Sequence, residues 1–423
     1  MATPDVVIVG GGPAGSSAAH ALARAGADVL VLDRARFPRP KPCAEYLSPQ
    51  ASRILADMGA LHQVEASGAA QLAGMVIRAP NGERIVGEFG RCAIRGYRDL
   101  GLSVRREVLD AILLERARAA GARVVEGARV TDVERDRSGR TIGVHTRGDD
   151  GSASMQRARL VIGADGLRSV VARRLGLARF ARWPRRLALV THYTGVGDIG
   201  TCGEMHVERD GYVGIADVGG GVTTAALVVP ASRAHEFAGV TSATDATRTG
   251  DGARARFLER WLASKPHLRD RFAAAVRVSP VRATGPFASH ARRAWAPGVA
   301  LVGDAADFFD PFTGEGIYAA LRGGELLAGF ALEVLRAPTT NAANRVLAAY
   351  DRARRTEFAG KWTVEKLIGA VVGSPVLMNR AARVLAARRD MADLLVGVTG
   401  DFVPAREVLR PGYLFTLFVA PAP

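Results

Sequence analysis

Runs of apolar residues separated by glycine-rich turns mark the first part of the chain. Val6–Val9 and Val29–Leu32 are short, uninterrupted and rich in β-branched residues, a pattern that predicts buried parallel strands. Between them, Ser16–Arg24 carries several alanines that let a helix lie closely on a sheet, and Gly26 stands where a helix C-terminal cap belongs. The order of strand, turn, helix and strand predicts an α/β fold.

The middle of the chain alternates between apolar and polar residues with the period of two that half-buried strands show. Asp210-Gly211 is a two-residue hairpin signal inside this region. The segments predict an antiparallel sheet, and the alanine- and arginine-rich chain after about residue 336 predicts helices. The alternating segments and the apolar tail that ends the chain are 187–195, 204–209, 212–218, 222–229 and 413–419.

The turn after the first strand, Gly10-Gly11-Gly12-Pro13-Ala14-Gly15, has a G-x-G-x-x-G spacing. In such a turn Gly10 permits the tight bend, Gly12 lets the backbone approach a pyrophosphate, and Gly15 lets the helix lie against the strand. The helix that follows offers free N–H groups to phosphates. Asp33 ends the second strand, where a carboxylate can accept hydrogen bonds from ribose hydroxyls. Together these residues predict a dinucleotide-binding site.

A second stretch with the same glycine spacing, 195–200, is not expected to bind a nucleotide. The residues after it, 204–207, alternate like a strand and do not open a helix. The stretch is therefore interpreted as a loop, and the sequence carries one credible dinucleotide-binding unit.

Two later segments repeat the pattern of an apolar strand that runs into a glycine and an aspartate. Leu160–Ile162 precedes Gly163-Ala164-Asp165-Gly166, and Val299–Val302 precedes Gly303-Asp304. An acid directly after a buried strand can bind a ribityl or ribose hydroxyl. The glycine-rich turn 311–316 then opens a predicted helix and can point backbone N–H groups at an electron-rich acceptor.

In this order the three motifs resemble the p-hydroxybenzoate hydroxylase superfamily of FAD enzymes, which includes aromatic hydroxylases, flavin halogenases and geranylgeranyl reductases. The resemblance implies FAD as cofactor and NAD(P)H as reductant. It also implies a discontinuous Rossmann-like FAD-binding domain, an inserted antiparallel β-sheet substrate domain and a C-terminal helical region. The cofactor-binding residues that it implies are Gly10, Gly12, Pro13, Ala14, Gly15, Asp33, Arg34, Arg106, Val130, Asp165, Gly166, Gly303, Asp304, Pro311, Gly314 and Gly316.

The resemblance divides the chain into alternating segments of two domains and a tail. The FAD-binding segments are residues 1–70, 101–180 and 283–335. The substrate-domain segments are 71–100 and 181–282, and the helical region is 336–423.

The segment Pro40–Pro49 resembles the Pro-x-x-Cys-Gly-Gly segment of geranylgeranyl reductases, with Cys43 on the family cysteine and Ala44 and Glu45 in place of the glycines. Cys43, Glu45 and Tyr46 are the candidate catalytic residues, because a thiol, a carboxyl and a phenol can act as acid or base beside a flavin. A small buried structural thiol is the alternative for Cys43.

Candidate substrate-binding residues lie in the predicted sheet and in the last glycine-rich turn: Tyr212, His192, His206 and Phe312. Only Tyr212 remains of the Tyr-x-Trp-x-Phe-Pro motif of geranylgeranyl reductases, and the halogenase motif Trp-x-Trp-x-Ile-Pro is missing. The sequence also has no HExxH, CxxC or GxSxG motif, so no metal site or hydrolase site is predicted.

These features favour an FAD-dependent, NAD(P)H-using monooxygenase of secondary metabolism. It would hydroxylate a small apolar aromatic or polyketide-like molecule through a C4a-hydroperoxyflavin, since the resemblance implies chemistry carried mainly by the flavin. The alternative is an FAD-dependent reductase of carbon–carbon double bonds, which the context of Cys43 supports. A third hypothesis is a non-catalytic escort or binding protein on the same fold.

Composition changes this picture little. The net charge is +15, but only four lysines occur and no block of five or six like charges marks a nucleic-acid arm. The arginines and the apolar tail leave a peripheral membrane or carrier-protein contact open. The three cysteines form no framework of disulfides. No signal peptide or membrane-spanning stretch is readable, so a cytoplasmic location is expected.

Overall fold

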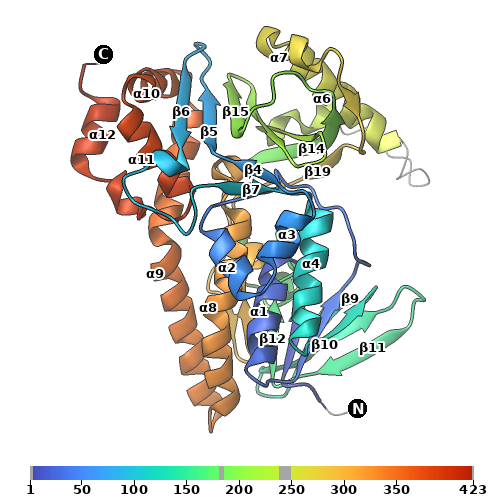
Figure 1. Cartoon of the computed structure of the whole chain (residues 1–423). Coiled ribbons are helices and arrows are strands. Elements are labelled where there is room, and N and C mark those ends of the chain that lie inside the picture. Colours follow the sequence, from blue (N-terminus) through green and yellow to red (C-terminus); the bar gives the residue numbers. More distant parts are fainter. Residues whose placement is uncertain (1–2, 181–184, 238–248, 422–423) are drawn as a thin grey trace.

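The computed structural model, shown in Figure 1, describes residues 3–180, 185–237 and 249–421. These residues form a mixed α/β fold with several sheets and a C-terminal group of helices, as predicted. The remaining positions lie outside the described residues although they fall within predicted segments: 1–2, 181–184, 238–248 and 422–423.

A six-stranded sheet holds the glycine-containing motifs. Its strands are parallel except for the edge pair β21–β22, and Val7 pairs with Leu30 on one side and Val161 on the other. In sheet order they are β21 (Trp295–Ala296), β22 (Val299–Leu301), β12 (Leu160–Gly163), β1 (Val6–Val9), β2 (Val29–Asp33) and β8 (Arg123–Glu126). Both faces are covered, which explains why these strands read as continuous apolar runs.

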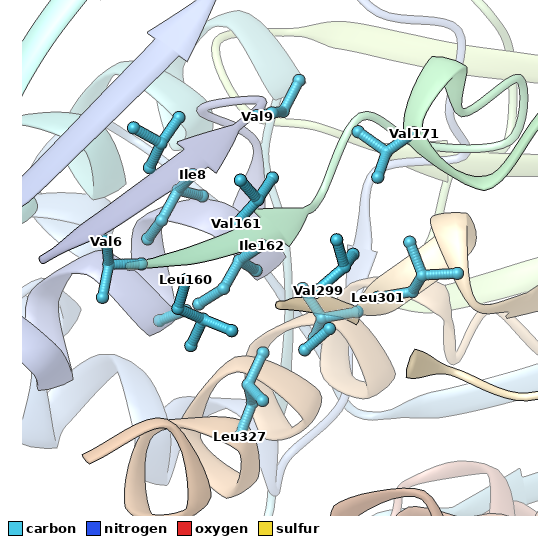
Figure 2. Packing of buried hydrophobic residues seen from close by; sticks show 14 of the residues in the cluster. Val6, Ile8, Val9, Leu160, Val161, Ile162, Val171, Val299, Leu301 and Leu327 are labelled. Atoms are coloured by element: carbon cyan, nitrogen blue, oxygen red, sulfur yellow. The ribbon is translucent and has the colours of Figure 1, made fainter. Parts of the chain in front are cut away.

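Helices α1 (Pro13–Arg24) and α8 (Gly316–Arg336) cover one face of this sheet. Proline at the first position of α1 fits a helix start, where its missing N–H costs nothing. A Cβ on Gly324 would lie 2.6 Å from the carbonyl oxygen of Ala14, so the two helices touch through backbone. Figure 2 shows the aliphatic side chains of β1, β12 and β22 packed together with Leu327 of α8.

A small sheet packs against the other face. It is antiparallel, and Val133 and Val144 belong to the same buried cluster as the central strands. Its strands are β11 (Ala153–Arg157), β10 (Thr141–Arg147) and β9 (Arg129–Arg135).

The alternating segments form a second, larger sheet of eight strands among the described residues. In order these are β18 (Val276–Arg277), β14 (Arg186–Thr194), β17 (Val222–Pro230), β16 (Gly211–Asp217), β15 (Cys202–Glu208), β5 (Gly74–Arg78) and β6 (Arg84–Glu88), with β19 (Arg282–Thr284) beside β14. Strands from residues 71–100 thus join those from 181–282. The predicted antiparallel pairing is present among β14, β15, β16 and β17, whereas β5 joins this sheet by pairing in parallel with β15. The hairpin turn lies one residue earlier than predicted, since Glu208 pairs with Gly211.

The two faces of the larger sheet have different neighbours. One face packs on α6 (Thr249–Ala263) and α7 (Pro266–Phe272) through residues such as Leu227 and Leu258. The other face, which we call the inner face, packs on Phe312 and on α10 (Pro375–Ala387), for example through Val228 and Leu385. The inner face therefore meets the glycine-rich turn that precedes α8.

The remaining elements connect these layers. They are the sheets β3 (Tyr46–Leu47), β7 (Gly101–Ser103), β4 (Ala70–Leu72) and β13 (Ala178–Phe180), β20 (Ser289–Ala291), β23 (Asp307–Phe308), and the helices α2 (Ala51–Asp57), α3 (Leu61–Ala66), α4 (Arg106–Ala119), α5 (Val170–Arg174), α9 (Thr340–Val372), α11 (Arg389–Thr399) and α12 (Pro411–Phe418). Short 3₁₀ turns include η3 (Gly303–Ala305) and η4 (Pro311–Thr313). None of the described helices combines the length and apolar character needed to cross a bilayer.

Candidate cofactor and active site

The glycine-containing turns meet at the carboxyl ends of the neighbouring strands β1, β12 and β22. Gly10 has a φ of +104°, and a Cβ built on it would lie 2.5 Å from the carbonyl oxygen of Ala164. A Cβ on Gly303, with φ of +61°, would lie 2.9 Å from the Cβ of Ala14. Neither position accepts a side chain, so glycine is required where the turns touch. Ligands of such sheets bind at these strand ends.

In the described part of the chain, the space beside the backbone of Gly12 is free of protein atoms except for the guanidinium of Arg39. A Cβ on Gly12 would have one neighbour within 4 Å among the described residues, the Arg39 guanidinium at 3.6 Å. Arg39 pairs with Asp110 at 3.0 Å and lies 4.0 Å from Asp33. Asp33 in turn accepts the backbone N–H of Gly11 at 2.8 Å. An open glycine backbone at a helix N-terminus, faced by a guanidinium, fits a pyrophosphate.

Arg106, at the start of α4, is a fixed positive charge inside the protein. It is 4% exposed and donates two parallel hydrogen bonds of 2.8 Å to the carboxylate of Asp110. Burial opposes the charge, but Asp110 and the neighbouring Cys43 outweigh that effect and raise the pKa of Arg106. The structure thus brings together the predicted residues Cys43 and Arg106.

We expect Asp110→Asn to lower the free energy of unfolding by about 3–5 kcal/mol, because it leaves the buried guanidinium of Arg106 and the partly buried guanidinium of Arg39 without their shared carboxylate. Urea unfolding measures the change as a lower midpoint at an unchanged slope. Asp99→Asn is the matched control, since it breaks an exposed pair with Arg95 and should cost less than about 1 kcal/mol. Equal losses of unfolding free energy in the two variants would contradict the conclusion that Asp110 forms a buried ion pair that stabilises the fold.

Asp165 and Lys41 lie at the second motif. One carboxylate oxygen of Asp165 accepts a backbone N–H at the start of α5 at 2.6 Å, and the other is buried without a hydrogen-bond partner among the described residues. Burial raises the pKa of Asp165. The Nζ of Lys41 lies 3.8 Å from the Cβ position of Gly166, and burial lowers its pKa while Asp304 opposes that shift. A buried acceptor without a partner fits a hydroxyl of a bound ligand.

Asp310 organises the turn before α8. Its carboxylate accepts the backbone N–H of Phe312 at 3.1 Å, the hydroxyl of Tyr212 at 2.7 Å and the guanidinium of Arg186 at 2.6 Å. The rings of Tyr212 and Phe312 meet edge to face, with centroids 5.0 Å apart. Burial, and then Asp310, raises the pKa of Tyr212. The structure thus places the predicted residues Tyr212 and Phe312 together, between the inner face and the turn.

Glu45 connects the loop between β2 and β3, which we call the cofactor loop, to the larger sheet. It is 2% exposed, and its carboxylate accepts the backbone N–H of Arg106 at 2.9 Å and lies 2.8 Å from Nε2 of His192 on β14. The other ring nitrogen of His192 lies 2.9 Å from the hydroxyl of Ser279. Glu45 has a φ of +67°, a left-handed conformation that favours glycine. The carboxylate contacts therefore hold a backbone shape that its own side chain disfavours.

A pair of substitutions separates these two effects. Glu45→Ala is expected to cost about 1–3 kcal/mol of stability, because it leaves the N–H of Arg106 and the ring of His192 without their partner. Glu45→Gly loses the same contacts but removes the left-handed penalty, so it should be about 1 kcal/mol more stable than the alanine variant. Thermal unfolding compares them, and an alanine variant as stable as wild type would contradict the role of the carboxylate.

Tyr46 lies against the glycine-rich turn that precedes α8. A Cβ on Gly314, whose φ is +73°, would lie 2.7 Å from the Tyr46 ring. The ring is also stacked on Phe89, and it packs with Ala216 at the edge of the inner face. Its hydroxyl is buried without a hydrogen-bond partner among the described residues. Burial, and then Glu315, raises the pKa of Tyr46 well above its usual value. The phenol therefore keeps its proton at neutral pH.

The expectation that His206 faces the substrate is corrected by the period of the strand. Met205 and Val207 pack on the inner face, so His206 points to the opposite face, toward α7. There it stacks on His267 and contacts Glu204 at 2.8 Å. Burial first, and then nearby cations, lowers the pKa of His267 to about 4. His206 therefore belongs to a structural cluster away from the glycine-containing turns.

Two predicted cofactor-binding residues form no hydrogen bond or ion pair with the turns described above in the described part of the chain, and two residues of the site were not predicted. Val130 is buried on β9, and Arg34 is exposed directly after β2. Sequence analysis did not identify Arg39 or Asp310. The available signals were a basic residue in the loop after Asp33 and an aspartate directly before a proline-led turn, where aspartate is a preferred cap.

Comparison with known proteins adds independent information. The family described as "FAD binding domain" matches residues 3–363. Digeranylgeranylglycerophospholipid reductase 2 of Methanopyrus kandleri is 32% identical over 94% of this chain and 93% of its own. Menaquinone reductase of Mycolicibacterium smegmatis is 28% identical over 94% of each chain. The structure of a myxobacterial chondrochloren halogenase has a TM-score of 0.76 and 25% identity, covering 86% of this chain and 82% of that one.

Proposed function

Because the chain belongs to the FAD-binding-domain family and is an FAD-dependent oxidoreductase, we propose that it reduces carbon–carbon double bonds of an isoprenoid chain. When bound, FAD supplies two electrons and one hydrogen to one carbon of the double bond. The glycine turns together with Asp33, Arg39, Asp165 and Asp304 would hold it. A nicotinamide nucleotide would be the source of the electrons.

Tyr46 is the observation that carries the proposal. Reduction of an isolated double bond needs a proton at the second carbon, and therefore a protonated group beside the cofactor. The Tyr46 hydroxyl is buried beside the turn that precedes α8 and makes no hydrogen bond among the described residues, so no protein acceptor competes for its proton. The raised pKa keeps that proton on the phenol at neutral pH but does not make the phenol a stronger acid, so the proposed role rests on its position.

The substrate class, an isoprenoid chain, is proposed from the relatives, since the apolar residues of the inner face, such as Val228, already pack on α10. The similarity to a reductase named for a digeranylgeranyl phospholipid supports this class. Cys43, in the segment that resembles reductases, lies beside Arg106. On the support of these points we propose the reductase first and keep as second candidate the monooxygenase that the sequence patterns alone favoured.

An anaerobic assay tests the proposal. Purified FAD-loaded protein is mixed with NADPH or NADH and a phospholipid that carries geranylgeranyl chains. The masses of the products are then determined by mass spectrometry. We expect a mass gain of two hydrogens for each reduced bond, without oxygen. A requirement for dissolved oxygen together with a gain of one oxygen atom would overturn the reductase and establish hydroxylation.

Hydroxylation of a small aromatic molecule with NAD(P)H and oxygen is the second candidate. Aromatic side chains surround the glycine-rich turn 311–316, which precedes α8 and which we call the cofactor turn. The ring centroids of Phe287 and Phe308 lie 5.2 Å apart, and the ring of Phe312 meets that of Tyr212 edge to face. Such an enclosure would keep water from a reactive oxygen species, which a monooxygenase needs. Substrate-stimulated oxygen consumption measures this activity directly.

A further inference from the structure

A cluster of ionisable side chains lies at the cofactor turn, residues 311–316 before α8, and has no role in the chemistry described above. Glu315 stands between Gly314 and Gly316, and its side chain is 2% exposed. Its Oε1 lies 3.3 Å from Nζ of Lys361 on α9. Lys361 also contacts the carboxylate of Asp401, whose side chain is 1% exposed. Segments that are far apart in the sequence thus converge on this turn.

Glu365, one helical turn after Lys361 on α9, completes the cluster. It is partly buried, and its position four residues after Lys361 places it on the face of α9 that carries the Lys361 contact to Glu315. The other titratable groups that act on the pair are Lys361, Asp310 and, toward Glu315, Tyr46. Burial raises the pKa of Glu315, and burial followed by repulsion from Glu315 raises that of Glu365 well above its usual value.

The charges of the cluster do not balance when every group is ionised. Three carboxylates and one ammonium leave two uncompensated negative charges in a buried space, and buried charge without a partner is strongly disfavoured. A proton held between two neighbouring carboxyls removes one of these charges, as in other pairs of close carboxylates. The arrangement therefore favours one proton on the pair at neutral pH.

The pair also lies next to the proposed proton donor. Oε2 of Glu315 and the hydroxyl of Tyr46 are both buried without a hydrogen-bond partner among the described residues. The Tyr46 ring touches Gly314, the residue before Glu315. Two unsatisfied polar groups in such proximity are suited to exchange a proton once a substrate or a water molecule completes the contact.

We propose that Glu315 and Glu365 share a proton and return it to Tyr46 after Tyr46 has protonated the substrate. The role rests on the proposed reduction of a double bond. In that step the π bond of the substrate breaks, a hydride equivalent that originates from the nicotinamide nucleotide forms a C–H bond at the first carbon, and the O–H bond of Tyr46 breaks as a C–H bond forms at the second carbon. The pair then reprotonates the phenolate and takes up a proton from solvent. Glu315 and Glu365 thus act through Tyr46, and Lys361 and Asp401 position them.

Infrared difference spectroscopy of the FAD-loaded protein tests the shared proton without any substrate. Wild type minus Glu365→Gln at neutral pH should show the carbonyl stretch of one protonated carboxyl group, because removal of one carboxyl lets the other ionise beside Lys361. Glu315→Gln is the second variant, should the first fail to fold, and it should lose the same band. Glu333→Gln, at an exposed position of α8, is the control that keeps the band. Loss of only an ionised carboxylate signal in both variants would overturn the proposal.

Comparison of steady-state turnover with the separated half-reactions tests the transfer. We expect Glu315→Gln to slow steady-state turnover by about 10²-fold, the lower range for proton transfer by a positioned group, because Tyr46 must be reprotonated between turnovers, and to leave both half-reactions of the first turnover unchanged. An equal loss in both half-reactions would mean a structural role and would overturn the transfer. If wild type reduces no double bond, the proposed function fails, while the infrared result still decides whether the pair shares a proton.

Discussion

Replacing Gly15 with alanine is expected to yield a protein that purifies without the yellow colour of bound FAD. A Cβ at this position would lie 1.9 Å from the carbonyl oxygen of Gly10. Because this oxygen is a backbone atom, no change of rotamer can relieve the clash. The first helix would have to move off the turn that approaches the pyrophosphate. We expect the affinity for FAD to fall by at least about 10³-fold, or about 4 kcal/mol. Cofactor content after purification and titration of apo-protein with FAD measure the loss.

Two further glycine variants separate cofactor binding from folding. Gly12→Ala leaves the fold intact, since its Cβ meets Arg39 only at 3.6 Å, but the methyl group enters the space assigned to the pyrophosphate. It should therefore weaken FAD binding at wild-type stability. Gly329→Ala, within α8 and with nothing within 4 Å of its Cβ, is the control and should bind FAD normally. Wild-type affinity of both Gly12→Ala and Gly15→Ala would place the cofactor elsewhere.

The elements around the glycine-containing turns could be predicted because their signals are local. The glycine spacing, the apolar strands β1, β2 and β12 and the alanines of α1 lie within short stretches, and each has a direct physical cause. Which strand pairs with which is not a local property. The parallel pairing of β5 with β15 joins Gly74 to Cys202, and no pattern near either residue specifies that partner.

The candidate site shows the same division. The Asp-Gly and Gly-Asp turns carry a local sequence pattern, so Asp165 and Asp304 could be proposed as site residues from the sequence. The carboxyl cluster could not, because Glu315, Lys361 and Asp401 meet only through the packing of α8, α9 and the chain after α11. His206 shows a further limit: the alternation of β15 indicates that its side chain opposes Met205, but only the fold shows which face meets the cofactor turn.

The same reasoning bears on Glu45. The resemblance to reductases placed a glycine at this position and made the glutamate look like a departure from the pattern. The backbone of Glu45 still adopts the left-handed conformation that glycine favours. The side chain that glycine lacks carries a carboxylate that contacts His192 on the larger sheet. A substitution that seems to weaken the family motif therefore adds a connection between the cofactor loop and the inner face.

Replacing Tyr46 with phenylalanine should slow substrate reduction by about 10²–10⁴-fold, the range that a positioned general acid contributes. The substitution keeps the ring on Gly314 and Phe89 and removes only a hydroxyl that forms no hydrogen bond among the described residues. Stability and FAD content should therefore stay at wild-type values. Single-turnover mixing of the pre-reduced enzyme with substrate measures the rate, and the mass of the product verifies the reaction.

Tyr193 supplies the matched control for this prediction. Its hydroxyl is also buried without a hydrogen-bond partner among the described residues, but the side chain packs on Phe272 on the face opposite the cofactor turn. Tyr193→Phe makes the same chemical change in a similar environment, so any general effect of losing a buried hydroxyl appears in both variants. A slow Tyr46→Phe beside a normal Tyr193→Phe assigns the proton to Tyr46. Equal rates in the two variants would remove Tyr46 as the donor, and the proton would then have to reach the substrate from another group or from water.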